Sequence, residues 1–280
     1  MRVYLNGRYV PQEEAVISVN DRGFLFGDGL YEVARVYNGR PFMMDAHLRR
    51  LADGLRWLQI DFEDVESLAG IAERLIEENE LHGDATVYIQ VSRGAAPRKH
   101  AFPSAAVPPT VYVAASPFND YPEEYWRDGV DAITAPDTRW ARCNFKTVNL
   151  LSNVLANQAA HAAGAFEALF VRDGVLIEGS HSNLFGVIDG TLVTYPNCNY
   201  ILPGITRAIV LELAAELGIP VRIGPILMEE LPRVSELFLS GTTTEVMPIA
   251  RLDGRPVGTG RAGPIAARLQ QAYRARTGRD

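Results

Sequence analysis

Lys146 is the residue of this chain whose surroundings most favour chemistry. It lies in the run Arg142–Leu150 and is the only lysine or arginine between Arg142 and Arg172. An ammonium group withdrawn from water gives up its proton readily, because burial disfavours the charged form. The neutral ε-amine forms Schiff bases with carbonyl compounds, so Lys146 is a candidate for covalent catalysis. The alternative is an exposed lysine at a strand-to-helix turn, and other motifs must decide between the two.

Two segments have the composition of phosphate-binding sites. Leu202–Arg207 opens an amphipathic helix, and such an N-terminus offers free N–H groups, a threonine hydroxyl and the positive end of the helix dipole. Ser240–Glu245 follows a predicted strand and would add further hydroxyl donors. Glycine and threonine are also common as simple caps, so neither segment identifies a phosphate site alone.

A basic loop, Arg93–Pro103, is a candidate site for a small anion. Arg93, Arg98, Lys99 and His100 place four cationic or titratable groups within eight residues of an acidic chain. Guanidinium groups bind carboxylates through paired hydrogen bonds, which suits this composition. Simple solvation of an exposed loop would explain it equally well.

Length and charge limit the possible classes of protein. The 280 residues are enough for two domains, and we expect a small α/β domain over 1–118, a linker over 119–125 and a larger domain over 126–280. The net charge of −7 argues against nucleic acid or an anionic membrane as partner. Two cysteines are too few for a disulfide framework or a cysteine-rich metal site, so no metal is expected. The N-terminus has neither a signal-peptide core nor a presequence, so a cytoplasmic location is expected.

Hydrophobic periodicity predicts strands and helices in both halves of the chain. In the first half we expect strands at 3–5, 8–10, 32–37, 87–91 and 110–115, and helices at 45–58 and at 65–76, the latter capped by Asp64. In the second half we expect helices at 150–163 and 205–217, hairpins at 168–177 and 184–194, and a strand at 236–239.

Four segments, taken together and in their order, resemble the fold type IV pyridoxal-phosphate enzymes, the class IV aminotransferases and their relatives. The segments are Asp21–Glu32, Arg139–Leu151, Glu178–Phe185 and Leu202–Arg207. The resemblance extends from Val3 to about Gly254. It implies an α/β (α+β) fold, with a small N-terminal α/β domain, a larger C-terminal domain containing a β-barrel, and pyridoxal 5'-phosphate between them.

The resemblance also implies roles for individual residues. Lys146 would hold the cofactor as a Schiff base and, once released by substrate, carry the proton between substrate and cofactor. Glu178 would face the pyridine nitrogen, where a carboxylate favours the protonated ring and strengthens it as an electron sink. Leu202 would pack on the ring. The phosphate would be held by Arg50, Ile205, Thr206 and Thr242.

Within this family, the loop Pro97–His100 resembles that of the D-amino-acid transaminases. There a Tyr, an Arg and a His bind the substrate α-carboxylate, the last two reaching across a dimer interface; here they would be Tyr31, Arg98 and His100. The implied function is a D-amino-acid:2-oxo-acid aminotransferase working by a ping-pong cycle, with D-alanine and 2-oxoglutarate as the expected substrates. The implied assembly is a homodimer with active sites at the interface.

Other functions stay open on the same scaffold. A branched-chain L-amino-acid or (R)-amine transaminase is the nearest alternative, followed by an aminodeoxychorismate lyase and a non-catalytic cofactor-binding protein. Two residues depart from the D-specific pattern. His181 stands where a small hydroxyl residue is usual, and it is either an exposed turn residue or a neighbour of the cofactor. Gly241 replaces a serine and removes one phosphate donor.

Overall fold

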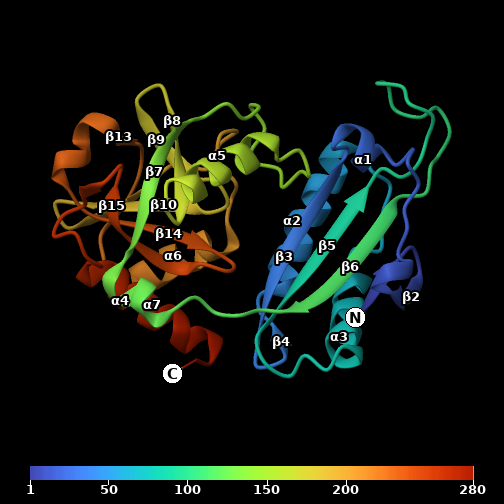
Figure 1. The fold of residues 1–280 in the computed structure, drawn as a ribbon, viewed down its shortest axis with the longest axis horizontal. Helices are drawn as coiled ribbons and strands as arrows, with labels where there is room; N and C mark the ends of the chain where they lie inside the picture. The colour runs from blue at the N-terminus through green and yellow to red at the C-terminus, as the bar shows by residue number, and fades with distance from the viewer. Residues whose placement is uncertain (280) are drawn as a thin grey trace. The chain divides into compact units, whose positions relative to one another are not determined.

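The computed structural model describes residues 1–279 and divides into two compact units (Figure 1). The first contains Met1–Asp120 and Phe145–Asn149; the second contains Tyr121–Asn144 and the chain from Leu150 onward. The chain thus leaves the first unit after Asp120, and the segment that carries Lys146 packs with that unit. The domain limits expected from the sequence stay a prediction.

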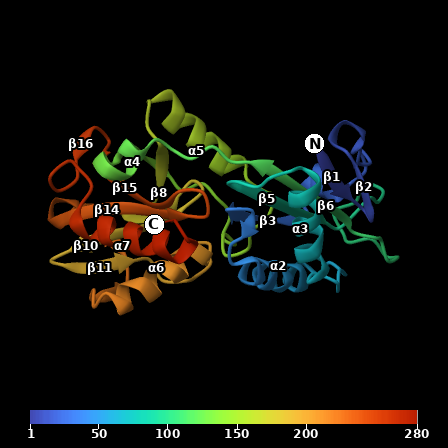
Figure 2. The same cartoon turned by 90° about the horizontal axis from the view of Figure 1, so that it is seen from below.

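The first unit is an antiparallel sheet with the strand order β2-β1-β6-β5-β3-β4. Its strands are β1 (Arg2–Leu5), β2 (Arg8–Pro11), β3 (Gly29–Tyr37), β4 (Arg40–Pro41), β5 (Ala85–Ser92) and β6 (Thr110–Pro117). Its helices are the 3-10 turn Gln12–Glu14, α1 (Arg22–Phe26), α2 (Met44–Leu58) and α3 (Ser67–Glu78). Figure 2 shows α2 and α3 on one face of the sheet.

Helical spacing of leucines builds the core of this unit. Leu48, Leu51 and Leu55 of α2 are buried in one apolar cluster with the alternating apolar residues of β5, as the sequence predicts. The predicted start of the next helix was wrong. Asp64 does not cap it; α3 begins at Ser67, whose hydroxyl donates to the Asp64 carbonyl.

The Lys146 segment lies beside the start of β3. The Tyr31 N–H donates to the Lys146 carbonyl at 2.9 Å, and the Val148 N–H donates to the Gly29 carbonyl at 3.1 Å. Gly27 ends α1 with a φ of 68°, a conformation that favours glycine. A Cβ at Gly27 would also lie 3.3 Å from the Cβ of Asn149. The absence of a side chain at Gly27 therefore allows the segment around Lys146 to pack closely beside the start of β3.

The second unit contains a closed six-stranded barrel, which confirms the barrel expected from the sequence. Around the ring the strands are β10 (Asn183–Ile188), β14 (Val234–Gly241), β15 (Glu245–Leu252), β7 (Val130–Pro136), β8 (Glu167–Arg172) and β9 (Val175–Gly179). The pair Asn183–Glu178 between β10 and β9 closes the ring. Further strands are β11 (Thr191–Thr194), β12 (Val221–Ile223), β13 (Ile226–Leu227) and β16 (Arg255–Pro256).

Helices cover the barrel. They are α4 (Glu123–Asp128), α5 (Leu151–Ala162), α6 (Ile205–Glu216), the 3-10 helix Met228–Arg233 and α7 (Pro264–Thr277). α6 and α7 lie over β14 and β15, and α5 lies against β7 and β8 (Figures 1 and 2). Among residues 1–279, no helix has the length and apolar character needed to cross a membrane.

Candidate active site

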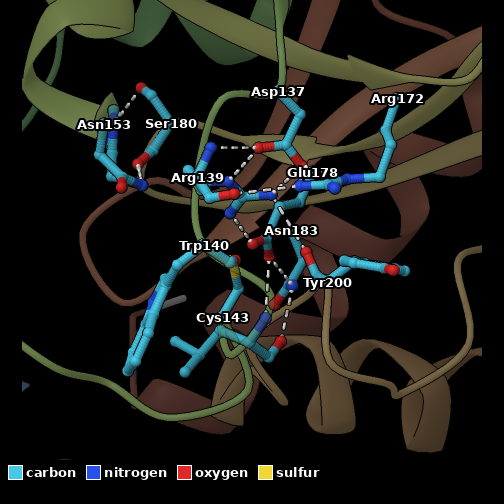
Figure 3. A network of polar contacts seen from close by, with 12 residues as sticks. Asp137, Arg139, Trp140, Cys143, Asn153, Arg172, Glu178, Ser180, Asn183 and Tyr200 are labelled. Carbon is cyan, nitrogen blue, oxygen red and sulfur yellow. Dashed lines mark hydrogen bonds and ion pairs between the residues drawn. The ribbon is translucent and has the colours of Figure 1, made fainter. Parts of the chain in front are cut away.

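Glu178 is buried at the end of β9, where the barrel closes, and its carboxylate accepts three hydrogen bonds (Figure 3). Arg139 donates through Nη1 to Oε1. The Asn183 Nδ2 donates to Oε2 at 3.0 Å, and the Leu202 N–H donates to Oε2 at 3.1 Å. Both carboxylate oxygens are thus oriented by groups from three separate segments.

Arg139 is itself fixed by Asp137. Its Nε donates to Asp137 Oδ1 at 2.9 Å and its Nη2 donates to Asp137 Oδ2 at 3.0 Å, while Arg172 Nε reaches Oδ2 at 3.1 Å (Figure 3). The guanidinium carbon lies 4.2 Å from the centre of the Phe170 ring. Sequence reasoning assigned no role to Asp137 or Arg139. A single Asp-x-Arg in a loop carries no signal of a partner 39 positions away.

Burial raises the pKa of Glu178 to about 7 from its ordinary 4.5, although the Arg139 charge and the hydrogen bonds from Arg139 and Leu202 act in the opposite direction. A carboxyl group with this pKa is readily ionised when a cation binds beside it, because a nearby positive charge lowers its pKa. Glu178 therefore suits a partner that is a protonated ring nitrogen.

The raised pKa predicts a pH dependence for the cofactor-free protein. Between pH 4.5 and about 7 the folded state binds a proton at Glu178 that the unfolded state has lost, so the free energy of unfolding falls as the pH rises. At about 1.4 kcal/mol per pH unit, the loss is roughly 3 kcal/mol. Urea unfolding of wild type and Glu178→Gln at pH 5 and pH 8 measures it. Equal pH dependence in the two proteins would contradict the assignment.

Asn183 connects Glu178 to the start of α6. Its Nδ2 also donates to the Leu202 carbonyl at 2.8 Å, and a Cβ on Gly204 would lie 2.0 Å from its Oδ1. Gly204 is the N-cap of α6 and has no side chain with which to cap it, so the first N–H groups of the helix remain suited to an anion. Ile205 and Thr206 follow directly.

The turn between β14 and β15, which carries Thr242, lies at the same end of the barrel, because Asn183 pairs with Ser240 across β10 and β14. The Ser240 and Thr244 hydroxyls are buried, and neither has a hydrogen-bond partner among the described residues. Buried hydroxyls without partners are costly, and a bound phosphate would supply acceptors at this end of the barrel. The residues present therefore suit the phosphate of the expected cofactor.

Gly241 has a structural explanation. A Cβ there would lie 2.5 Å from Thr244 Oγ1. The Thr244 hydroxyl therefore occupies the space that a serine side chain at position 241 would need.

His181 is oriented by Glu167. Its N–H donates to Glu167 Oε1 at 2.7 Å, and its ring Nδ1 lies 3.2 Å from the same oxygen. Glu167 is fully buried and also accepts from Ser182 Oγ at 2.9 Å. The imidazole itself is 41% exposed. The first of the two interpretations of His181, a turn residue, matches this geometry, and the sequence contained no hint of Glu167.

In the first unit, Lys146 and Arg50 each lie beside a residue of β3. The Lys146 Nζ is 4.3 Å from the centre of the Tyr31 ring. Arg50 binds Glu32 with both Nε and Nη2 at 2.7 Å, and His47 Nδ1 lies 2.7 Å from Glu32 Oε2. Burial raises the pKa of Glu32, but Arg50 and His47 outweigh it and lower that pKa to about 2. An ionised Glu32 therefore fixes Arg50, and sequence reasoning missed both Glu32 and His47.

The three predicted carboxylate ligands are not in contact within one chain. Tyr31 stacks on Tyr88 with ring centres 5.7 Å apart. Arg98 and His100 are exposed and flank the Phe26 ring, at 5.1 Å and 5.5 Å from its centre. In the described part of the chain no hydrogen bond or ring contact joins Tyr31 to either of them.

Two buried arginines hold the loop that carries Arg98 and His100. Arg22 donates to the Lys99 carbonyl at 2.6 Å and the His100 carbonyl at 3.3 Å. Asp28 binds both Arg22 and Arg93, each at 2.8 Å. The loop backbone is therefore anchored to the core even though Arg98, Lys99 and His100 are exposed.

Comparison with known proteins identifies the family. Residues 29–252 match the amino-transferase class IV family. The D-alanine aminotransferase of Staphylococcus aureus strain COL is 39% identical over 273 residues, which cover 97% of this chain and 96% of that protein. The D-alanine aminotransferase of Bacillus licheniformis is 40% identical over 274 residues, covering 97% and 95% of the two chains.

Solved structures agree on the fold. A branched-chain amino acid aminotransferase of Escherichia coli superposes with a TM-score of 0.90 at 31% identity, covering 98% of this chain and 93% of that one. A second branched-chain amino acid aminotransferase, solved with pyridoxamine 5'-phosphate, gives 0.89 at 33%, covering 100% and 95%. A 4-amino-4-deoxychorismate lyase from Pseudomonas aeruginosa gives 0.84 at 33%, covering 98% of each chain.

This chain belongs to the class IV aminotransferases. Enzymes of this family use pyridoxal 5'-phosphate, so the cofactor expected from the sequence is confirmed, as are the family and the enzyme class. The roles of the individual site residues stay predictions. No group of three or more His, Cys, Asp or Glu side chains within residues 1–279 is arranged to hold a metal ion.

Proposed function

We propose that this protein transfers the amino group of a D-amino acid to a 2-oxo acid with pyridoxal 5'-phosphate, and that D-alanine and 2-oxoglutarate are its substrates. The observation that carries the proposal is the 39% identity to a D-alanine aminotransferase over 97% of the chain. The buried Glu178 with its three donors supports the choice of cofactor.

Each proposed role follows from the chemistry of the side chain. The bound cofactor supplies an electron sink for the charge that develops when a proton leaves the substrate Cα. Glu178 holds the proton on the ring nitrogen, and Leu202 packs on the ring. The Lys146 ε-amine binds the cofactor covalently and later moves the proton at the substrate Cα. Arg50, the N-terminal N–H groups at Ile205 and Thr206, and Thr242 bind the phosphate.

The substrate carboxylate is assigned to Tyr31, Arg98 and His100. Arg98 and His100 are exposed on their own chain, which leaves them available to the site of a second copy. We therefore propose a homodimer in which each chain lends these two side chains to its partner. We also propose a cytoplasmic location, which the free thiols of both cysteines support.

Product analysis separates the proposed activity from its alternatives. An aminotransferase forms more than one equivalent of pyruvate per site from D-alanine only when 2-oxoglutarate is present, and a ping-pong cycle gives parallel double-reciprocal plots. A branched-chain enzyme would instead consume L-leucine. A lyase would release pyruvate from aminodeoxychorismate without an amino acceptor. Continuous pyruvate formation that needs both D-alanine and 2-oxoglutarate is the expected result, and failure to form it would contradict the proposal.

Replacement of Arg98 by alanine tests the carboxylate assignment. Loss of a charged bidentate contact should lower kcat/KM for D-alanine by roughly 10- to 100-fold. Arg98→Lys should restore only part of it, because an ammonium lacks the planar pair of donors. A primary amine without a carboxylate is the control substrate, and its rate should change far less. Equal losses for both substrates would show that Arg98 acts on the fold instead of the carboxylate.

A further inference from the structure

The turn that carries Thr242 ends in an unusual backbone conformation. Gly241 pairs with Glu245 across β14 and β15, which leaves the three-residue loop Thr242–Thr244. Glu245, the first residue of β15, has a φ of 54°, in the left-handed region that favours glycine. The Cβ of glutamate disfavours this conformation, and contacts of its side chain help to hold it there.

The side chain of Glu245 is completely buried and bound to α7. Gln270 Nε2 donates to Glu245 Oε2 at 2.6 Å, and Gln270 Oε1 accepts from the Val246 N–H at 2.9 Å. Arg279 Nη1 donates to Glu245 Oε1 at 3.3 Å. A buried carboxylate is costly without such partners, so the conformation of the turn is tied to the position of α7.

α7 is well suited to act as a fixed support. Glu236 of β14 accepts hydrogen bonds from the N–H groups of Ile265 and Ala266, at 3.1 Å and 2.9 Å, and thereby caps the first turn of the helix. The helix is thus joined to β14 at its N-terminus and to β15 through Gln270. Figure 2 shows it lying along these strands.

We propose that Glu245 and Gln270 are positioning residues that hold the Gly241–Thr244 turn in the shape that binds the cofactor phosphate. The inference rests on the proposed function. Neither residue touches the phosphate; both act through the backbone of the turn. Without the pair, no side-chain contact would hold residue 245 at its positive φ, and Thr242 and the buried Thr244 hydroxyl would no longer be fixed in place. The loss of cofactor affinity should come from the phosphate contacts alone, and binding of the pyridine ring should be unchanged.

The experiment compares pyridoxal 5'-phosphate with pyridoxal, which lacks the phosphate. Dissociation constants for both are measured on the full-length protein after removal of the cofactor. The variants are Gln270→Leu, Glu245→Gly and Glu245→Gln. Glycine accepts a positive φ without strain but has no carboxylate, so it separates backbone preference from anchoring. The matched control is Arg276→Gln, since Arg276 lies on α7 and binds the exposed Glu212 and Glu216.

The ratio of the pyridoxal constant to the pyridoxal 5'-phosphate constant should fall about tenfold or more in Gln270→Leu and Glu245→Gly. It should change by no more than about twofold in Arg276→Gln. Glu245→Gln should lose less than Glu245→Gly, because glutamine keeps an acceptor for Gln270 but not the charge that faces Arg274 and Arg279. An unchanged ratio in Glu245→Gly would overturn the inference. If Gln270→Leu does not fold, the result for Glu245→Gly alone decides. A wild type that binds neither compound would instead contradict the proposed function.

Discussion

Lys146→Ala is expected to lower the rate of transamination by at least about a thousandfold, since it removes both the covalent attachment and the group that moves the substrate proton. Treatment of the wild type with borohydride should fix the cofactor irreversibly to the protein, and mass spectrometry of the digest should place the label on Lys146. In the variant the label should be absent and the half-reaction with D-alanine undetectable on the wild-type time scale.

The sequence provides a matched control for this experiment. Lys99 and Lys146 are the only lysines in the chain, so Lys99→Arg keeps the charge of the basic loop and leaves one lysine to carry the label. That variant should be labelled like the wild type. A label on Lys99, or full activity of Lys146→Ala, would remove the basis of the proposed mechanism.

Glu178→Gln is expected to keep the cofactor attached but to slow the half-reaction with D-alanine by about a hundredfold or more, which corresponds to ~2.7 kcal/mol in the barrier. A neutral amide no longer favours the protonated ring nitrogen, so the ring accepts charge less well. Arg139, which binds Glu178 in the folded protein, would then face an uncharged partner. Stopped-flow absorbance under single-turnover conditions measures the rate directly.

Glu212→Gln is a suitable control for this change. Glu212 is exposed and binds Arg276, so the variant loses a carboxylate of the second unit without touching the buried network. Its half-reaction should match the wild type. If Glu178→Gln also matched the wild type, Glu178 could not be the partner of the ring nitrogen.

Local signals in the sequence predicted the elements and the family correctly. The leucine spacing of 48–55 identified α2, and the alternation of 87–91 identified β5, because each pattern reports burial within one element. The segments around Lys146, Glu178 and Leu202 identified the family, because each is a short motif that needs no knowledge of distant contacts. The exact start of α3 was missed, since Asp64 is a favoured cap by residue type, whereas the helix begins after Glu66, whose side chain makes no capping hydrogen bond.

Contacts between distant segments could not be predicted in the same way. Arg139 binds Glu178 from 39 positions away, and Arg50 binds Glu32 from 18 positions away. Such pairs depend on how strands and helices pack, and a single sequence does not record that. The same holds for the pairing of the Lys146 segment with the start of β3, and for Gln270, which reaches Glu245 from α7.

The handedness of the amino acid substrate tests the central claim most directly. D-alanine, L-leucine and L-glutamate are added separately to the enzyme with its cofactor and without any 2-oxo acid, and the visible absorbance band of the bound cofactor is followed. In the proposed site, Tyr31 together with Arg98 and His100 of a second copy would fix the carboxylate, so only one enantiomer could present its Cα hydrogen to Lys146. We expect rapid loss of the band with D-alanine and no change with either L-amino acid. Rapid loss with L-leucine or L-glutamate and no change with D-alanine would contradict the account.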